Sequence, residues 1–193
     1  MIKSKADLKF YIEEDKKRNL WQPNRSYLFY LAKLLYGSAD AKAYHYMKSL
    51  RKYEYILQCK KTLTSRMLRL WRQWRLNSLS VKYNTYIGAN MVGYGFRIRH
   101  IGGGLVINCL SMGNYCSASC WVLVGNKDSQ ENRATIGENV ILTPGAKIIG
   151  KVAVGNNCVI APNSVVVKDV PDNCVVSGIP AKIIKKDGQK FIE

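Results

Sequence analysis

Acidic residues are scarce in this sequence, and its middle contains none. The chain has 13 Asp and Glu against 30 Lys and Arg, and no acidic residue lies between Glu54 and Asp128. The excess of positive charge is greatest in residues 1–80. So basic a surface suits phosphates, an anionic membrane or another anionic partner. Because no nucleic-acid-binding motif accompanies the charge, we do not expect a nucleic acid partner.

Histidine is nearly absent, and the cysteines form no recognisable pairs. The chain has only two histidines, His45 and His100, and its six cysteines include no CxxC pair. A zinc site built from Cys and His therefore has little support, and no disulfide framework is indicated. We predict no bound metal and reduced thiols in a packed interior.

Long apolar runs are also missing. No stretch approaches the roughly 18–20 apolar residues that span a bilayer. The opening residues "MIKSKADLKFYIEED" are charged and have a helical period, unlike a secretory signal. These absences predict a cytoplasmic protein.

Residues 1–80 have the hydrophobic period of α-helices. Ser4 followed by Asp7 resembles a capping box, and Gly37 is placed to end a helix. His45 lies within the third helical stretch and has no catalytic context there. The predicted helices cover residues 4–17, 23–37, 39–58 and 63–77.

From residue 136 onward the period is six. Neither a helix nor a flat sheet keeps a six-residue repeat on one face, whereas a parallel β-helix places one aliphatic residue inside at every rung. A small or β-branched residue follows four positions later, where the interior is crowded. We therefore divide the chain into a helical segment, residues 1–80, and a mainly β domain, residues 81–193, with a C-terminal tail. The aliphatic positions are Ile136, Leu142, Ile148, Val154, Ile160 and Val166.

The repeat extends backwards with two irregularities. Its earlier rungs are Val81, Ile87, Val92, Ile98, Met112, Ala118 and Val124. Three glycines, residues 102–104, absorb a slip in register just after His100. The polar segment 126–135 cannot pack inside, so we expect it to loop out of the coil. Irregular places in a regular solenoid are where function tends to be located.

The motifs around these irregularities resemble a known family. "RHIGGG", the looped-out "GNKDSQENRAT" and the closing "GIPAK" are similar to motifs of bacterial left-handed β-helix acyltransferases. The most similar subgroup contains serine O-acetyltransferases and the O-acetyltransferases of capsule and exopolysaccharide clusters. The resemblance implies a left-handed β-helix, a homotrimer, and acetyl-CoA bound in the groove between two subunits.

The resemblance also implies residue roles. His100 falls on the family histidine that takes the proton from the acceptor hydroxyl, a task that suits imidazole. The partner aspartate of the serine enzymes, fifteen residues upstream, falls on Thr85, and their second histidine falls on Arg133. A backbone carbonyl would then orient the His100 ring. The implied acetyl-CoA contacts are Pro144, Gly145, Ala146, Ala161, Pro162, Lys168, Pro180, Lys182 and Lys185.

The helix predicted over residues 63–77 is basic and amphipathic. Leu63, Met67 and Trp74 lie on one arc of a helical wheel, and arginines lie on the opposite arc. Either this helix packs its apolar arc on the β-helix or on partner subunits, or it contacts an anionic inner membrane peripherally.

The function expected from the sequence is acetyl-CoA-dependent O-acetylation. The missing partner aspartate favours a sugar hydroxyl of a surface polysaccharide or its precursor as acceptor. The alternative is serine O-acetyltransferase, and a second alternative is a non-enzymatic basic scaffold that binds membranes. The β-helical zinc carbonic anhydrases need three histidines, which this chain lacks.

Overall fold

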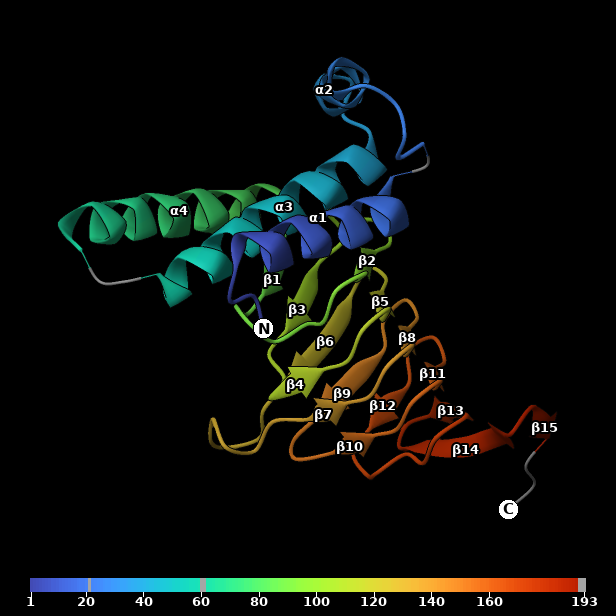
Figure 1. Cartoon of the computed structure of the whole chain (residues 1–193). Helices are drawn as coiled ribbons and strands as arrows, with labels where there is room; N and C mark the ends of the chain where they lie inside the picture. Colours follow the sequence, from blue (N-terminus) through green and yellow to red (C-terminus); the bar gives the residue numbers. More distant parts are fainter. Residues whose placement is uncertain (21, 60–61, 191–193) are drawn as a thin grey trace.

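The structure, a computed structural model, describes residues 1–20, 22–59 and 62–190. Four helices come first, and a column of short strands follows (Figure 1). The helices lie across one end of the column, and α2 lies on the side of α3 that faces away from it. Their bounds are α1 (Lys5–Asn19), α2 (Tyr27–Leu35), α3 (Ala39–Gln58) and α4 (Leu63–Lys82).

The strands wind as a parallel solenoid with three faces. Strands of successive coils pair in parallel, so each face is a sheet running along the column. The first face contains β1 (Thr85–Ile87), β3 (Leu105–Ile107), β6 (Val122–Gly125), β9 (Lys147–Ile149) and β12 (Val165–Val166). The second contains β4 (Ser111–Met112), β7 (Thr135–Ile136) and β10 (Ala153–Val154). The third contains β2 (Arg97–Ile98), β5 (Ser117–Ala118), β8 (Ile141–Leu142), β11 (Val159–Ile160), β13 (Cys174–Gly178), β14 (Ala181–Lys186) and β15 (Gln189–Lys190).

The six-residue period predicted the interior of the solenoid correctly. Every aliphatic position from Ile136 to Val166 is buried, as are the small residues four positions later. The expected loop lies between β6 and β7. Four cysteines are buried, two are half-buried, and all six are free. The reduced thiols are therefore mainly part of the packed interior, as expected.

The helices begin and end where local signals place them, with two differences from prediction. Ser4 caps α1 in a full capping box, as predicted. Helix α2 begins at Tyr27 rather than near residue 23, because Ser26 accepts the Phe29 amide as its N-cap. Helix α4 continues to Lys82, so Val81 is a helical residue with 84% of its surface exposed, and its expected place as a β-helix rung is wrong.

Side chains of α1 and α3 replace a missing coil at the first end of the solenoid. Asn19 accepts a hydrogen bond from the Ile98 amide at 3.0 Å and donates one to the Phe96 carbonyl at 2.7 Å, as a neighbouring strand would. Glu54 accepts the Asn90 amide at 2.8 Å. The backbone groups of the first coil, which would otherwise lack partners, are satisfied in this way.

A buried ion triad joins the same elements. The fully buried Arg51 guanidinium pairs with Asp15 at 2.8 Å and Glu54 at 3.0 Å. It also donates to the carbonyl of Val92 at 2.9 Å. Although burial opposes its charge, the two carboxylates raise the pKa of Arg51 above its ordinary value. Helices and first coil therefore share one interior.

A column of glycines lies where each coil leaves the second face. A Cβ added to Gly113 would lie 2.7 Å from the carbonyl of Gly137, and one added to Gly137 would lie 2.8 Å from the carbonyl carbon of Gly155. Real Cβ atoms do not come so close to backbone, so neighbouring coils leave no room for a side chain here.

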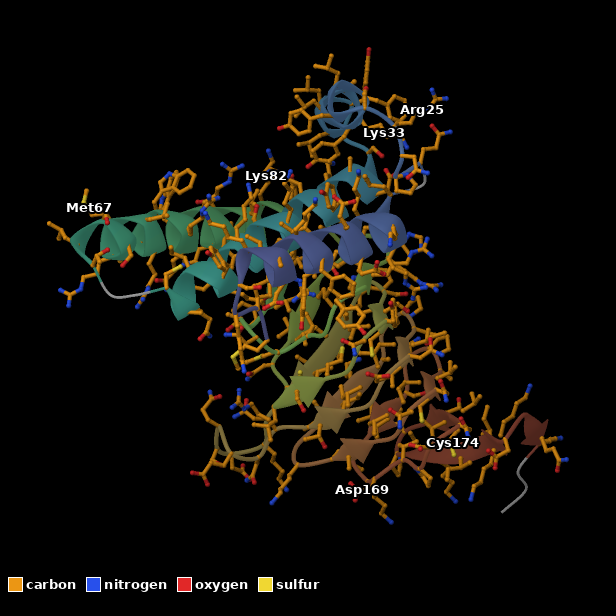
Figure 2. All side chains as sticks on the ribbon, viewed as in Figure 1. Arg25, Lys33, Met67, Lys82, Asp169 and Cys174 are labelled. Atoms are coloured by element: carbon orange, nitrogen blue, oxygen red, sulfur yellow. The ribbon has the colours of Figure 1, made fainter. Side chains whose placement is uncertain are left out.

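The apolar arc of α4 is not covered by the rest of the chain. Leu63, Met67 and Trp74 are each at least 66% exposed. Met67 lies on the part of the helix that extends beyond the β-helix (Figure 2). In the described chain, the predicted packing of this arc on its own β-helix is therefore wrong. No described helix has the length and apolar character needed to cross a membrane.

Candidate functional site

Four turns stack along the edge where the chain passes from the third face to the first, and the turn that joins β13 to β14 follows them on the same edge. Hydrogen bonds join successive turns: Trp121 N–H donates to Gly103 O at 3.1 Å, and Gly145 N–H donates to Cys120 O at 3.0 Å. In the next turn, Asn163 N–H donates to Pro144 O at 3.0 Å. We call this edge the His100 edge; it comprises residues 99–104, 119–121, 143–146, 161–164 and 177–180.

His100 lies in the longest turn of the first four coils on this edge. Its φ is +57°, in the left-handed region that few side chains adopt, and its side chain is exposed. Gly103 passes so close to the next coil that a Cβ there would lie 2.5 Å from Cys120 Cβ. The glycines thus let a six-residue turn fit where later coils use three or four residues.

The same turn offers free backbone donors. Among the described residues, the amides of Gly102 and Gly104 donate no hydrogen bond. Both residues have positive φ, +99° and +81°. Backbone N–H groups of this kind can stabilise an oxyanion if they point at the place where it forms.

Thr85 cannot orient His100. Its side chain is buried, and its hydroxyl donates to the Tyr83 carbonyl at 2.9 Å. Asn84, one residue earlier, is exposed and lies on top of the His100 edge, where its carbonyl accepts the Leu105 amide. The residue to which the fifteen-residue count leads therefore faces the interior rather than this edge. The structure shows no hydrogen-bond partner for the His100 ring within the described chain, so orientation by a backbone carbonyl stays a prediction.

The surroundings of His100 are cationic. Arg97 and Arg99 flank Ile98 on β2 and its turn, and no Asp or Glu lies on the His100 edge. Burial, Arg97 and Arg18 lower the pKa of Arg99 from its ordinary value. No carboxylate of this edge is therefore available to pair with the ring.

Most of the residues assigned to acetyl-CoA lie on the His100 edge. Pro144, Pro162 and Pro180 are exposed along it, Ala161 is half-buried, and Gly145 and Ala146 are buried. The chain then turns back at the Ile179–Pro180 cis peptide into β14, which exposes Lys182 and Lys185. One column thus combines small side chains with cations at its far end.

Lys168 and Arg133 lie elsewhere. Both lie where the chain passes from the first face to the second, and we call this the loop edge. Lys168 is exposed there, and Arg133 Nε donates to the Gln130 carbonyl at 2.6 Å within the looped-out segment. One chain therefore does not bring these two cations together with His100.

Residues 133–168 match the family model described as bacterial transferase hexapeptide, six repeats. The chain belongs to the hexapeptide-repeat family. This hexapeptide-repeat chain is 31% identical over 165 residues to a serine acetyltransferase of Buchnera aphidicola. The aligned region covers 83% of this chain and 56% of that protein. It is 34% identical over 115 residues to a serine acetyltransferase of Synechococcus elongatus, and the aligned region covers 58% of this chain and 47% of that protein. The chain spans about half the length of the curated relatives it matches.

Solved structures agree in fold with the hexapeptide-repeat chain. Neisseria gonorrhoeae serine acetyltransferase in complex with serine superposes with a TM-score of 0.71 at 26% identity, covering 94% of this chain and 71% of that one. Brucella abortus serine acetyltransferase in complex with coenzyme A gives a TM-score of 0.71 at 23% identity, covering 94% and 69%. The left-handed parallel β-helix with N-terminal helices is thereby confirmed.

Proposed function

We propose that the chain is an acetyl-CoA-dependent O-acetyltransferase that works at the His100 edge. The observation that carries the proposal is the stacking of His100 and six of the nine expected acetyl-CoA contacts on one edge of the solenoid. The relatives named as serine acetyltransferases support the same activity.

The reaction needs a base and an oxyanion site. His100 accepts the proton of the acceptor hydroxyl as its oxygen attacks the thioester carbonyl. The free amides of Gly102 and Gly104 stabilise the negative charge that develops on the carbonyl oxygen. The tetrahedral intermediate then expels the coenzyme A thiolate, which takes up a proton, and the acetyl ester remains on the acceptor. Lys182 and Lys185 meet the phosphates of the donor as mobile point charges.

Serine is the acceptor that the comparisons favour. The relatives reported above are named serine acetyltransferases, and one solved neighbour is described in complex with serine. They lend no support to a polysaccharide acceptor, which the sequence alone had favoured. A sugar hydroxyl stays the second candidate because of two residue differences: no acidic side chain lies on the His100 edge, and Arg133 replaces the second histidine.

A homotrimer would complete this site. The outward side chains of the first face include Tyr86, Val106, Leu123 and Val165, and Tyr86 and Val106 are 51% and 38% exposed. This face lies between the His100 edge and the loop edge. If three copies turn it inward around a threefold axis, each His100 edge meets the loop edge of the next copy. Lys168 and Arg133 would then reach the groove from the neighbouring subunit.

Peripheral membrane contact through residues 63–77 and a cytoplasmic location stay predictions. The exposed apolar arc of α4 suits either a neighbouring subunit or a lipid surface. The comparisons give no support to membrane contact.

The activity is tested by mass spectrometry of acetylated product. The protein is incubated with acetyl-CoA and L-serine, with nucleotide sugars, or with capsule fragments, and L-alanine serves as the acceptor that lacks a hydroxyl. We expect O-acetylserine and no product from L-alanine. Absence of product from every acceptor, together with no acetyl-CoA binding by calorimetry, would leave the scaffold interpretation in its place.

A further inference from the structure

Away from the His100 edge, a cavity lies among the helices, and four cationic side chains line it. The cavity has a volume of about 250 Å³ and opens between α2, α3 and α4. None of its lining residues belongs to the β-helix. Its cations are Lys48, Lys52, Arg72 and Arg75, and the remaining lining residues are Tyr27, Tyr30, Leu31, Leu34, His45 and Ser49.

Among the described residues, none of these four cations forms an ion pair, although Glu13, outside the lining, partly offsets the charge of Lys48 through space. The lining includes no Asp or Glu, and the ion pairs of the described residues use other cations. Burial and repulsion from Lys48, Arg72 and Arg75 lower the pKa of Lys52. Burial and repulsion from Arg75 lower the pKa of Arg72 in the same way. Unpaired cations facing one partly desolvated space cost stability, which a bound anion would recover.

Two neutral groups also line the cavity, and one of them adds a donor. Arg75 Nη2 lies 3.2 Å from His45 Nε2, and because a guanidinium only donates, that ring nitrogen accepts. Burial and the surrounding cations lower the pKa of His45, in keeping with a neutral ring. The Tyr30 hydroxyl has no hydrogen-bond partner among the described residues although Tyr30 is only 8% exposed. Burial raises the pKa of Tyr30, so this phenol stays a donor.

The adjacent cavity shows that the arrangement is not a general property of this basic segment. That space, between α1, α2 and α3, shares Tyr27, Tyr30 and Lys48 with the first. Two of its other cations, Lys16 and Lys33, pair with acids of the lining, and Lys33 lies 3.1 Å from Asp40. The α2–α3–α4 cavity differs because its lining contains no acid at all.

We propose that the α2–α3–α4 cavity binds the phosphate group of a small organic phosphate. Lys48, Lys52, Arg72 and Arg75 neutralise the phosphate, and the Tyr30 hydroxyl donates to it. Leu31, Leu34 and the ring of Tyr27 form the apolar wall against which the organic part packs. The phosphate belongs either to a soluble metabolite or to a phospholipid headgroup. This inference is independent of the acetyltransferase activity, because the site shares no residue with the His100 edge.

Thermal unfolding with inorganic pyrophosphate tests the site. A ligand that binds only the folded chain raises Tm. Ionic strength is held constant with sodium chloride, so that general screening is the same in every sample. We expect pyrophosphate to raise the Tm of the wild type, and the Lys48→Gln/Lys52→Gln variant to show at least about tenfold weaker binding.

Two variants with the same change of charge separate this site from others. Lys5→Gln/Lys9→Gln removes two exposed cations of α1, and Lys182→Ala/Lys185→Ala removes those proposed to meet coenzyme A. Both should keep the full pyrophosphate response of the helical site. An equal response in all variants, or none in the wild type, would overturn the proposal.

Vesicles identify the source of the phosphate. Sedimentation with phosphatidylcholine vesicles, with and without phosphatidylglycerol, is compared for wild type and Lys48→Gln/Lys52→Gln. Loss of anionic-vesicle binding in the variant assigns the site to a headgroup, and unchanged vesicle binding with a lost pyrophosphate response assigns it to a soluble phosphate.

A measurement on the unaltered chain covers the case in which the variant does not fold. The chain has only two histidines, so the imidazole proton resonances can be assigned with His100→Asn. Pyrophosphate in the cavity should raise the pKa of His45, because the bound anion offsets the surrounding cations. An unchanged His45 titration at saturating pyrophosphate would exclude binding there.

Discussion

At the scale of single residues, His100 combines an exposed imidazole with a left-handed backbone. Its φ of +57° lies where Asn and Gly are comfortable and most side chains are strained. His100→Ala would therefore change the backbone preference as well as remove the ring. Asn keeps a polar group of similar size and tolerates the conformation.

We predict that His100→Asn lowers turnover by roughly 10²–10⁴, the usual contribution of a positioned base. Acetyl-CoA affinity should stay near the wild-type value, because the expected donor contacts lie on later coils. Steady-state kinetics with the identified acceptor and calorimetry with acetyl-CoA measure the two quantities. Near-normal turnover would show that His100 is structural and that the base lies elsewhere.

The second histidine has a consequence for stability. Burial, Arg75 and Lys48 lower the pKa of His45, so the folded chain favours its neutral form. The stabilisation that this gives is present above the unfolded value of about 6.5 and is lost as the pH falls through the lower folded pKa. Urea titrations should therefore show a steeper loss of unfolding free energy below about pH 6.5 in the wild type than in His45→Gln. Parallel curves would mean that His45 protonates equally in both states.

At the scale of elements, the glycine column lets the coils approach to the spacing that their backbone hydrogen bonds set. Gly137→Ala would force its Cβ against the backbone of the next coil, and overpacking of this kind costs about 1–3 kcal/mol. Gly125→Ala, on β6, is the matched control, because its nearest contact would be an ordinary 3.8 Å to Leu123. Denaturant unfolding should show a large loss for the first and a small change for the second. Equal losses would mean that the conformational freedom of glycine, rather than the lack of space for a Cβ, determines the cost.

The regular elements could be predicted from the sequence, and the places where they meet could not. A period of six fixes which residues point inward, because each coil repeats the same contacts locally. Asp15, Arg51 and Glu54 carry no such signal: their pairing depends on how α1 and α3 cross the first coil. The orientation of Thr85 could not be predicted for a related reason, since a count along the chain does not show whether a side chain near a corner faces inward. The cationic cavity likewise combines residues of three helices.

At the scale of the whole molecule, the outward row of the first face predicts association, because it is apolar except for Lys147. We expect a mass close to three times 21.9 kDa by light scattering. Tyr86→Lys/Val106→Lys should shift the wild-type trimer toward monomer and reduce turnover, while circular dichroism keeps its shape. Thr135→Lys/Ala153→Lys adds the same charge on the second face and should stay trimeric. A monomeric wild type would remove both the trimer and the shared groove.

The hydrogen bonds of Asn19 to Phe96 and Ile98 have a consequence for polymerisation. The end of a solenoid is a ready template on which another chain can continue the same ladder, and an uncovered end invites fibril growth. Here α1 occupies that template at one end, and at the other the chain folds β14 antiparallel onto β13. Removing the amide of Asn19 would therefore free the backbone groups of the first coil while the interior of the solenoid stays covered. Molecules would then add end to end into filaments rather than form an amorphous aggregate.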